Sequence, residues 1–146
     1  ALARFQGVKR RMEILASCED YVIYDDFAHH PTEIFKTLSS LREKIGNDQI
    51  IAVIEPRSRT MQSGLHDKEI AKALSPADSV IWYEGQDVKR SMSAELKKAK
   101  AEVYFAANIS EIIQITRQIK TTKSNIVIMS NGDFSGLREL IKRELD

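Results

Sequence analysis

Short apolar runs alternate with amphipathic helical patterns along the chain, and this alternation constrains the fold more than any other feature. Strands are predicted at residues 21–24, 49–54, 79–83, 103–105 and 125–129. Helices are predicted at residues 31–45, 67–74, 92–99, 109–119 and 137–145, and a helix end at residues 1–6. Repeated strand–helix alternation is typical of a doubly wound parallel sheet, because parallel strands need long, right-handed crossovers.

The start of the chain departs from this rule. A short strand at residues 11–16 is joined to the run at 21–24 by an acidic turn at 18–20. So short a connection permits only an antiparallel pair. We therefore predict an α/β fold: a Rossmann-like, doubly wound and mostly parallel sheet with an N-terminal antiparallel hairpin strand, forming one domain over residues 1–146.

Composition narrows the functional classes. The net charge is +1, which favours neither a nucleic-acid partner nor a membrane surface. No apolar run is long enough for a membrane span, and no signal-peptide pattern opens the sequence. Cys18 is the only cysteine, so no internal disulfide can form, which fits a reducing compartment. We expect a cytoplasmic protein.

Acidic and imidazole side chains follow the first long apolar run. Asp25 and Asp26 end that run, His29 and His30 follow, and Pro31 suits the first position of a helix. Ligands of open α/β sheets collect at the carboxyl ends of strands, beside helix N-termini that attract anions. This stretch is therefore a candidate site for a phosphorylated ligand. Ordinary capping and turn residues are one alternative, and a metal site built from the two Asp and two His is a less favoured one.

Three loops should share the carboxyl edge of such a sheet: residues 25–30, 55–61 and 130–136. The second loop carries Arg57, whose guanidinium suits carboxylates and phosphates, and the third carries Gly132, which allows close backbone approach. Solvated arginines and a simple turn would give the same pattern. No Gly-rich Lys-Ser/Thr phosphate loop is present, so a nucleotide site here would complete one built elsewhere.

The motifs GVKRRME at residues 7–13 and DDFAHHPTE at 25–33 resemble the C-terminal domain of the Mur ligases, the ATP-dependent amino-acid and peptide ligases of bacterial cell-wall synthesis. Within the family, EPRS at 55–58 and MSNG at 129–132 are similar to the murein peptide ligase branch. The L-alanine ligase branch has a His-Arg loop in place of Pro-Arg-Ser. A glycine-richer turn is usual where Asp133 and Ser135 stand here.

The resemblance implies that this chain is the last domain of a three-domain enzyme. That enzyme joins UDP-N-acetylmuramate to the murein tripeptide L-alanyl-γ-D-glutamyl-meso-diaminopimelate in peptidoglycan recycling, through an acyl phosphate. It implies ATP and Mg²⁺ as cofactors, with the metal held mainly by the central domain and no metal ligand in this chain. The partners implied are the central and N-terminal domains, and the isolated domain is expected to be inactive.

The resemblance also implies roles for individual residues. Arg11 would approach the ATP phosphates and stabilise developing charge, Asp26 would bind the ribose, and His29 would lie beside the nucleoside. The residues that would face the tripeptide are Arg57, Ser58, Thr60, Ser130, Asn131 and Gly132.

Two alternative functions remain. The first is a sister Mur ligase that takes free L-alanine, for which the loop at 55–61 is the discriminating feature. The second is a stand-alone phosphoacceptor module that resembles receiver domains, with Asp25 and Asp26 holding magnesium. Such a module needs an acceptor Asp at the end of a central strand, where this chain has Glu55 and Pro56.

Overall fold

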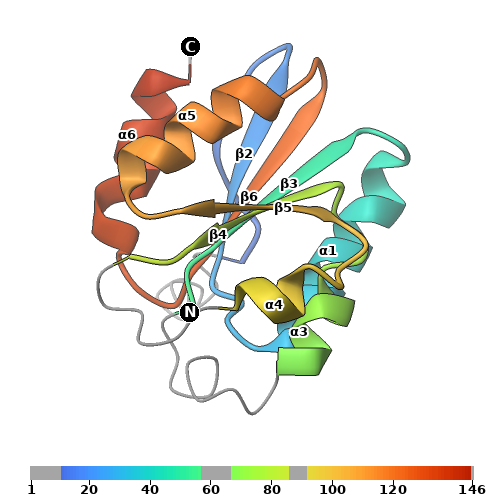
Figure 1. Cartoon of the computed structure of the whole chain (residues 1–146). Helices are drawn as coiled ribbons and strands as arrows, with labels where there is room; N and C mark the ends of the chain where they lie inside the picture. Colours follow the sequence, from blue (N-terminus) through green and yellow to red (C-terminus); the bar gives the residue numbers. More distant parts are fainter. Residues whose placement is uncertain (1–10, 57–66, 86–91, 146) are drawn as a thin grey trace, which may run out of the picture.

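A computed structural model describes residues 11–56, 67–85 and 92–145 (Figure 1). The strands are β1 (Glu13–Ser17), β2 (Tyr21–Asp26), β3 (Gln49–Ile54), β4 (Ser79–Tyr83), β5 (Glu102–Ala106) and β6 (Ser124–Met129). The helices are α1 (Pro31–Ile45), α3 (Asp67–Ala73), α4 (Ser93–Leu96), α5 (Ile109–Ile119), the 3₁₀ helix η2 (Phe134–Gly136) and α6 (Leu137–Glu144). Within these ranges, no helix has the length and apolar character needed to cross a membrane.

The strands form one sheet in the order β1-β2-β6-β3-β4-β5. Among the strands of the described residues, only the β1–β2 pair is antiparallel, which confirms the predicted hairpin and the mostly parallel sheet. Helices α1, α3 and α4 cover one face, and α5 and α6 cover the other (Figure 1). The connection through α5 changes face and returns to the middle of the sheet, so β6 lies between β2 and β3.

Two apolar cores separate the sheet from its helices. Successive side chains of a strand point to opposite faces. In β6, Val127 packs with α1, α3 and α4, whereas Ile126 and Ile128 pack with α5 and α6. Every residue of β6 is buried, because helices cover both faces of a central parallel strand. This double burial explains why the strands appear in the sequence as continuous apolar runs.

The predicted bounds hold for α1, β3, β4 and α5, and those of β1, β5, β6, α3 and α6 differ by one or two residues at an end. The differences at β2 and α4 have a physical cause. Strand β2 extends through Asp25 and Asp26, which pair in parallel register with Ile128 and Met129 of β6. Helix α4 is shorter than the predicted 92–99, because bonds between residues three apart replace the helical ones near its end. The helix end predicted at residues 1–6 lies outside the described residues.

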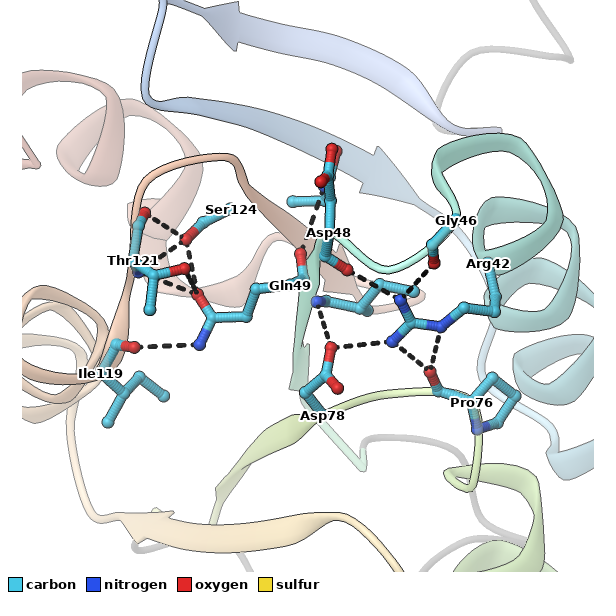
Figure 2. A network of polar contacts seen from close by, with 11 residues as sticks. Arg42, Gly46, Asp48, Gln49, Pro76, Asp78, Ile119, Thr121 and Ser124 are labelled. Carbon is cyan, nitrogen blue, oxygen red and sulfur yellow. Dashed lines mark hydrogen bonds and ion pairs between the residues drawn. The ribbon is translucent and has the colours of Figure 1, made fainter.

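A network of hydrogen bonds connects the amino ends of β3, β4 and β6 (Figure 2). The Arg42 guanidinium, from the last turns of α1, donates to the carbonyls of Gly46, Asp48 and Pro76 and to the Asp78 carboxylate. The Gln49 side chain forms the second half of the network. It donates to Ile119 O at 2.9 Å and accepts from the Ser124 hydroxyl at 2.5 Å. This network lies at the opposite edge of the sheet from the predicted site.

Candidate functional site

The carboxyl ends of three neighbouring strands meet at one edge. Ser130 N donates to Asp26 O at 3.2 Å, and Glu55 N donates to Met129 O at 3.1 Å. The ends of β2, β6 and β3 are therefore side by side, as the sequence predicted for the loops that follow them. Helix α1 leaves this edge on one face and α6 leaves it on the other (Figure 1). Such a divergence of helices opens the crevice in which α/β sheets bind ligands.

Asp26 connects the hairpin, the loop after β2 and α1. Its Oδ2 accepts the backbone N–H of Met12 at 2.9 Å, and its Oδ1 accepts that of Ala28 at 2.8 Å and lies 3.5 Å from the Thr37 hydroxyl. Burial raises the pKa of Asp26, and the two backbone hydrogen bonds and the Arg11 charge oppose that rise. The carboxylate is thus held rigidly, and Oδ2, which accepts one hydrogen bond from Met12 N, keeps a lone pair for another donor.

Arg11 and Asp26 line the same cavity, between the β1–β2 hairpin and α1. The cavity has a volume of about 370 Å³. Lys36 and Lys44 of α1 bring two further cations to its wall, and Thr37 and Ser40 bring hydroxyls. Three cations around one carboxylate suit an anionic ligand that also carries hydroxyl groups. The sequence pointed to Arg11 and Asp26, whereas nothing marked the lysines beyond their place on the polar face of a helix.

The two histidines have different surroundings. His30 is the N-cap of α1, and its Nδ1 accepts from Thr32 N at 3.3 Å. His29 Nδ1 lies 3.0 Å from Phe27 O and 3.8 Å from the Glu33 carboxylate, and its ring meets that of Phe27 edge-on at 5.3 Å. Among the described residues, no group of three or more His, Cys, Asp or Glu side chains is placed to hold a metal ion.

The turn after β6 is shaped by its own side chains. Ser130 is fully buried; its hydroxyl donates to the Glu55 carboxylate and accepts from Gly132 N at 2.9 Å. Asn131 and Gly132 are half-buried beside it. Further on, the buried Phe134 ring packs edge-on against Tyr83 at 5.3 Å. The turn is therefore anchored to β3 on one side and to the core on the other.

A contact that the sequence did not indicate joins Asp25 to Arg138. Asp25 is 3% exposed, and its Oδ1 accepts from Arg138 Nε at 2.8 Å. Arg138 Nη1 also donates to the Asp133 carbonyl at 2.7 Å. Arg138 is one more polar position of an amphipathic helix, so no local pattern distinguishes it. Three of the predicted peptide-binding residues, Arg57, Ser58 and Thr60, lie outside the described residues.

Comparison with known proteins shows which family and which solved structures this chain resembles. The family "Mur ligase, glutamate ligase domain" matches residues 10–132. The UDP-N-acetylmuramate–L-alanyl-gamma-D-glutamyl-meso-2,6-diaminoheptandioate ligase of Haemophilus influenzae is 36% identical over 99% of this chain and 32% of its own length. A crystal structure of a murein peptide ligase from Psychrobacter arcticus superposes with a TM-score of 0.83 at 33% identity, covering 94% of this chain and 30% of that one.

Ligases with a different amine substrate match as well. The UDP-N-acetylmuramate–L-alanine ligase of Streptococcus agalactiae is 49% identical over 139 residues, which is 91% of this chain and 30% of that protein. This chain therefore spans about a third of the length of the curated relatives that it matches.

Proposed function

This chain belongs to the Mur ligase family, and we propose that it is the C-terminal domain of an ATP-dependent ligase. The full-length enzyme would join UDP-N-acetylmuramate to L-alanyl-γ-D-glutamyl-meso-diaminopimelate in peptidoglycan recycling, in the cytoplasm. The observation that carries this proposal is the convergence of β2, β6 and β3, where Ser130 hydrogen-bonds to both neighbouring strand ends. That edge gathers groups suited to a nucleotide and a turn suited to a peptide.

The nucleotide side of the site is the cavity beside Asp26. Its three cations suit phosphate oxygens, and its carboxylate can accept hydrogen bonds from ribose hydroxyls. We assign the phosphates of ATP to Arg11, the ribose to Asp26, and a place beside the nucleoside to His29. ATP supplies the phosphoryl group that activates the muramyl carboxylate. Arg11 would contribute by stabilising the charge that develops during this transfer.

The peptide side of the site is the turn after β6 together with the loop after β3. Asn131 and Gly132 are half-buried in this turn, and the hydrogen bond from Gly132 N to the buried Ser130 hydroxyl fixes the backbone there. We assign the carboxylates of the tripeptide to Arg57 and its neighbours Ser58 and Thr60, because a guanidinium binds a carboxylate through two parallel hydrogen bonds.

The remaining parts of the site belong to the rest of the enzyme. Mg²⁺ would be held mainly by the central domain, and the N-terminal domain would bind UDP-N-acetylmuramate. The 146-residue chain alone should therefore neither hydrolyse ATP nor form a peptide bond. Closure of the domains over ATP would keep the activated carboxylate away from water.

The second candidate is the L-alanine ligase, favoured by the 49% identity to the Streptococcus agalactiae enzyme. Against it stands the loop after β3, where Glu55 and Pro56 begin the EPRS sequence in place of a His-Arg loop. The receiver-like alternative lacks its acceptor Asp, because the residue after β3 is Glu55, whose carboxylate is hydrogen-bonded to Ser130.

Amine competition in the full-length enzyme tests the proposal. With UDP-N-acetylmuramate, ATP and magnesium, the tripeptide should be ligated, and an excess of L-alanine should not reduce its incorporation. Preferential use of L-alanine would establish the second candidate instead. The isolated chain, assayed in parallel, should release no phosphate from ATP; a stable acyl phosphate formed on it by a small phosphodonor would overturn the assignment to a ligase.

A further inference from the structure

The turn after β6 has an unfavourable backbone. Phe134, Ser135 and Gly136 follow one another with φ values of 54°, 52° and 77°, and only the last is a glycine. Left-handed backbone is disfavoured for residues that carry a Cβ atom, and single residues rather than runs normally adopt it. Such a run persists when surrounding contacts over-determine it. The turn therefore depends on restraints from outside its own sequence.

Arg138 restrains the turn by linking it to the neighbouring strand β2. It stands in the first turn of α6, directly after the left-handed run. Its Nε donates to Asp25 Oδ1 at 2.8 Å, and its Nη1 donates to the Asp133 carbonyl at 2.7 Å. One planar guanidinium thus fixes the turn relative to the end of β2, next to Asp26. Its geometry allows both bonds at once, which the point charge of a lysine would not.

Stability alone gives a poor account of this arginine. The Asp25 and Arg138 side chains are only 4% and 15% exposed, and a buried ion pair is a weak source of stability because both charges lose their hydration. Arg138 Nη2 is also buried and has no hydrogen-bond partner among the described residues. An unpaired buried donor carries a desolvation cost that an apolar side chain would avoid. What the pair supplies is a defined geometry.

We propose that Asp25 and Arg138 are a positioning pair, which holds the turn at 130–136 in the conformation that receives the peptide substrate. The inference rests on the proposed function, because it assigns that turn to the amine substrate. Loss of the pair releases the left-handed run, shifts Asn131 and Gly132, and weakens peptide binding. The cavity beside Asp26 lies on the other face of β2, so ATP binding is left largely unchanged.

The test uses the full-length ligase with Arg138→Met, Asp25→Asn and the double variant. Each should raise the KM for the tripeptide by about tenfold or more, since small misplacements of binding groups are costly. The KM for ATP should change by less than about twofold, and the double variant should be no worse than the worse single, because the two residues act as one unit. Arg138→Lys should recover only part of the affinity.

Arg117→Met is the matched control. Arg117 of α5 donates to the carbonyl and the carboxylate of Glu144, at the C-terminal end of α6. Like Arg138 it makes polar contacts with α6, but it does so far from the turn. This variant should leave both KM values unchanged. In the 146-residue chain, amide hydrogen exchange at Gly132 should accelerate in Arg138→Met and stay the same in Arg117→Met.

The possible results distinguish an error in the role of the Asp25–Arg138 pair from an error in the proposed substrate. A lower melting temperature with an unchanged tripeptide KM would reduce Arg138 to a structural residue and overturn the inference. An equal rise in KM for Arg117→Met would do so too. If the wild-type enzyme uses L-alanine and not the tripeptide, the proposed substrate is wrong, and the KM for L-alanine then decides the role of the pair.

Discussion

The hydroxyl of Ser130 donates a hydrogen bond to the carboxylate of Glu55, across the carboxyl ends of β6 and β3. The two residues are 75 positions apart in the chain. The same hydroxyl accepts from Gly132 N at 2.9 Å, so one buried group sets both the spacing of the two strand ends and the start of the turn. The first residues of the two loops proposed to bind the peptide, Glu55 and Ser130, are thereby joined.

Ser130→Ala should damage both the fold and the peptide site. The substitution leaves Gly132 N and the Glu55 carboxylate without their shared partner, which should lower the free energy of unfolding by about 1–3 kcal/mol. In the full-length enzyme the KM for the tripeptide should rise as well. Urea unfolding and steady-state kinetics measure the two effects. Ser17→Ala, at an exposed position of β1, is the control and should change neither quantity.

Asp26→Asn should alter the pH dependence of stability. Burial raises the pKa of Asp26 above 3.8, so the folded chain holds this proton more tightly than the unfolded chain. The stability due to this proton is fully present below 3.8 and is lost as the pH rises through the folded pKa. The free energy of unfolding of the wild type, relative to Asp26→Asn, should therefore fall between acidic and neutral pH.

Denaturant unfolding of both proteins at several pH values measures this difference. Asp20→Asn, which removes an exposed carboxylate from the hairpin turn, is the control. A difference between wild type and Asp26→Asn that stays constant with pH would contradict the prediction. Since Asp26 also binds Met12 N and Ala28 N, we expect the variant to lose some stability at every pH.

Ser135→Gly should stabilise the chain. Ser135 has φ 52° and ψ 36°, a left-handed conformation that costs roughly 1 kcal/mol for a residue with a Cβ atom. Glycine removes this cost but adds freedom to the unfolded chain, so the net gain should be positive and below about 1 kcal/mol. Ser135→Ala keeps the Cβ atom and should give no gain. Thermal unfolding of the two variants distinguishes backbone strain from an effect of the hydroxyl.

Arg42→Lys should destabilise the fold without affecting the site. Arg42 binds three carbonyls and the Asp78 carboxylate (Figure 2), and a lysine cannot satisfy all of them. We expect a loss of about 2 kcal/mol in the free energy of unfolding. Arg117→Lys, at an exposed ion pair, should cost less than about 1 kcal/mol. A changed KM for ATP in Arg42→Lys would contradict this expectation, because it would show that the network affects the ATP site at the carboxyl ends of the strands.

Arg11→Ala should lower the turnover of the full-length ligase by about a hundredfold, as loss of a contact to transition-state charge can. Folding should be nearly unaffected, because Arg11 is exposed. Turnover at saturating ATP and tripeptide is the measurement. Arg143→Ala, an exposed arginine on α6, is the control for lost positive charge. Unchanged turnover in Arg11→Ala would remove this residue from the chemistry.

Local signals in the sequence were sufficient to predict the order and type of the elements in the described residues. Pro31, expected at the first position of a helix, begins α1 in the structure. The convergence of strand ends followed from the parallel topology alone. These predictions worked because periodicity and capping depend on residues a few positions apart.

Contacts between distant residues could not be predicted in the same way. The bond between Asp25 and Arg138 spans 113 positions, and neither residue has a local pattern that selects the other. The insertion of β6 between β2 and β3 depends on which face α5 crosses, and an apolar helical stripe is the same on either face. The left-handed φ of Phe134 could not be predicted for a related reason, since its ring packs against Tyr83, which is distant in the sequence.

The hydrogen bond from Met12 N to Asp26 gives the hairpin a mechanical role. Met12 has φ 53°, so the backbone bends sharply just before β1, and the bend is clamped to the carboxylate that lines the cavity. Because Met12 N donates directly to Asp26 Oδ2 and Glu13 begins β1, any displacement of this bend would change both that hydrogen bond and the start of the strand. The position of Met12 and the shape of this cavity are therefore linked through a single hydrogen bond.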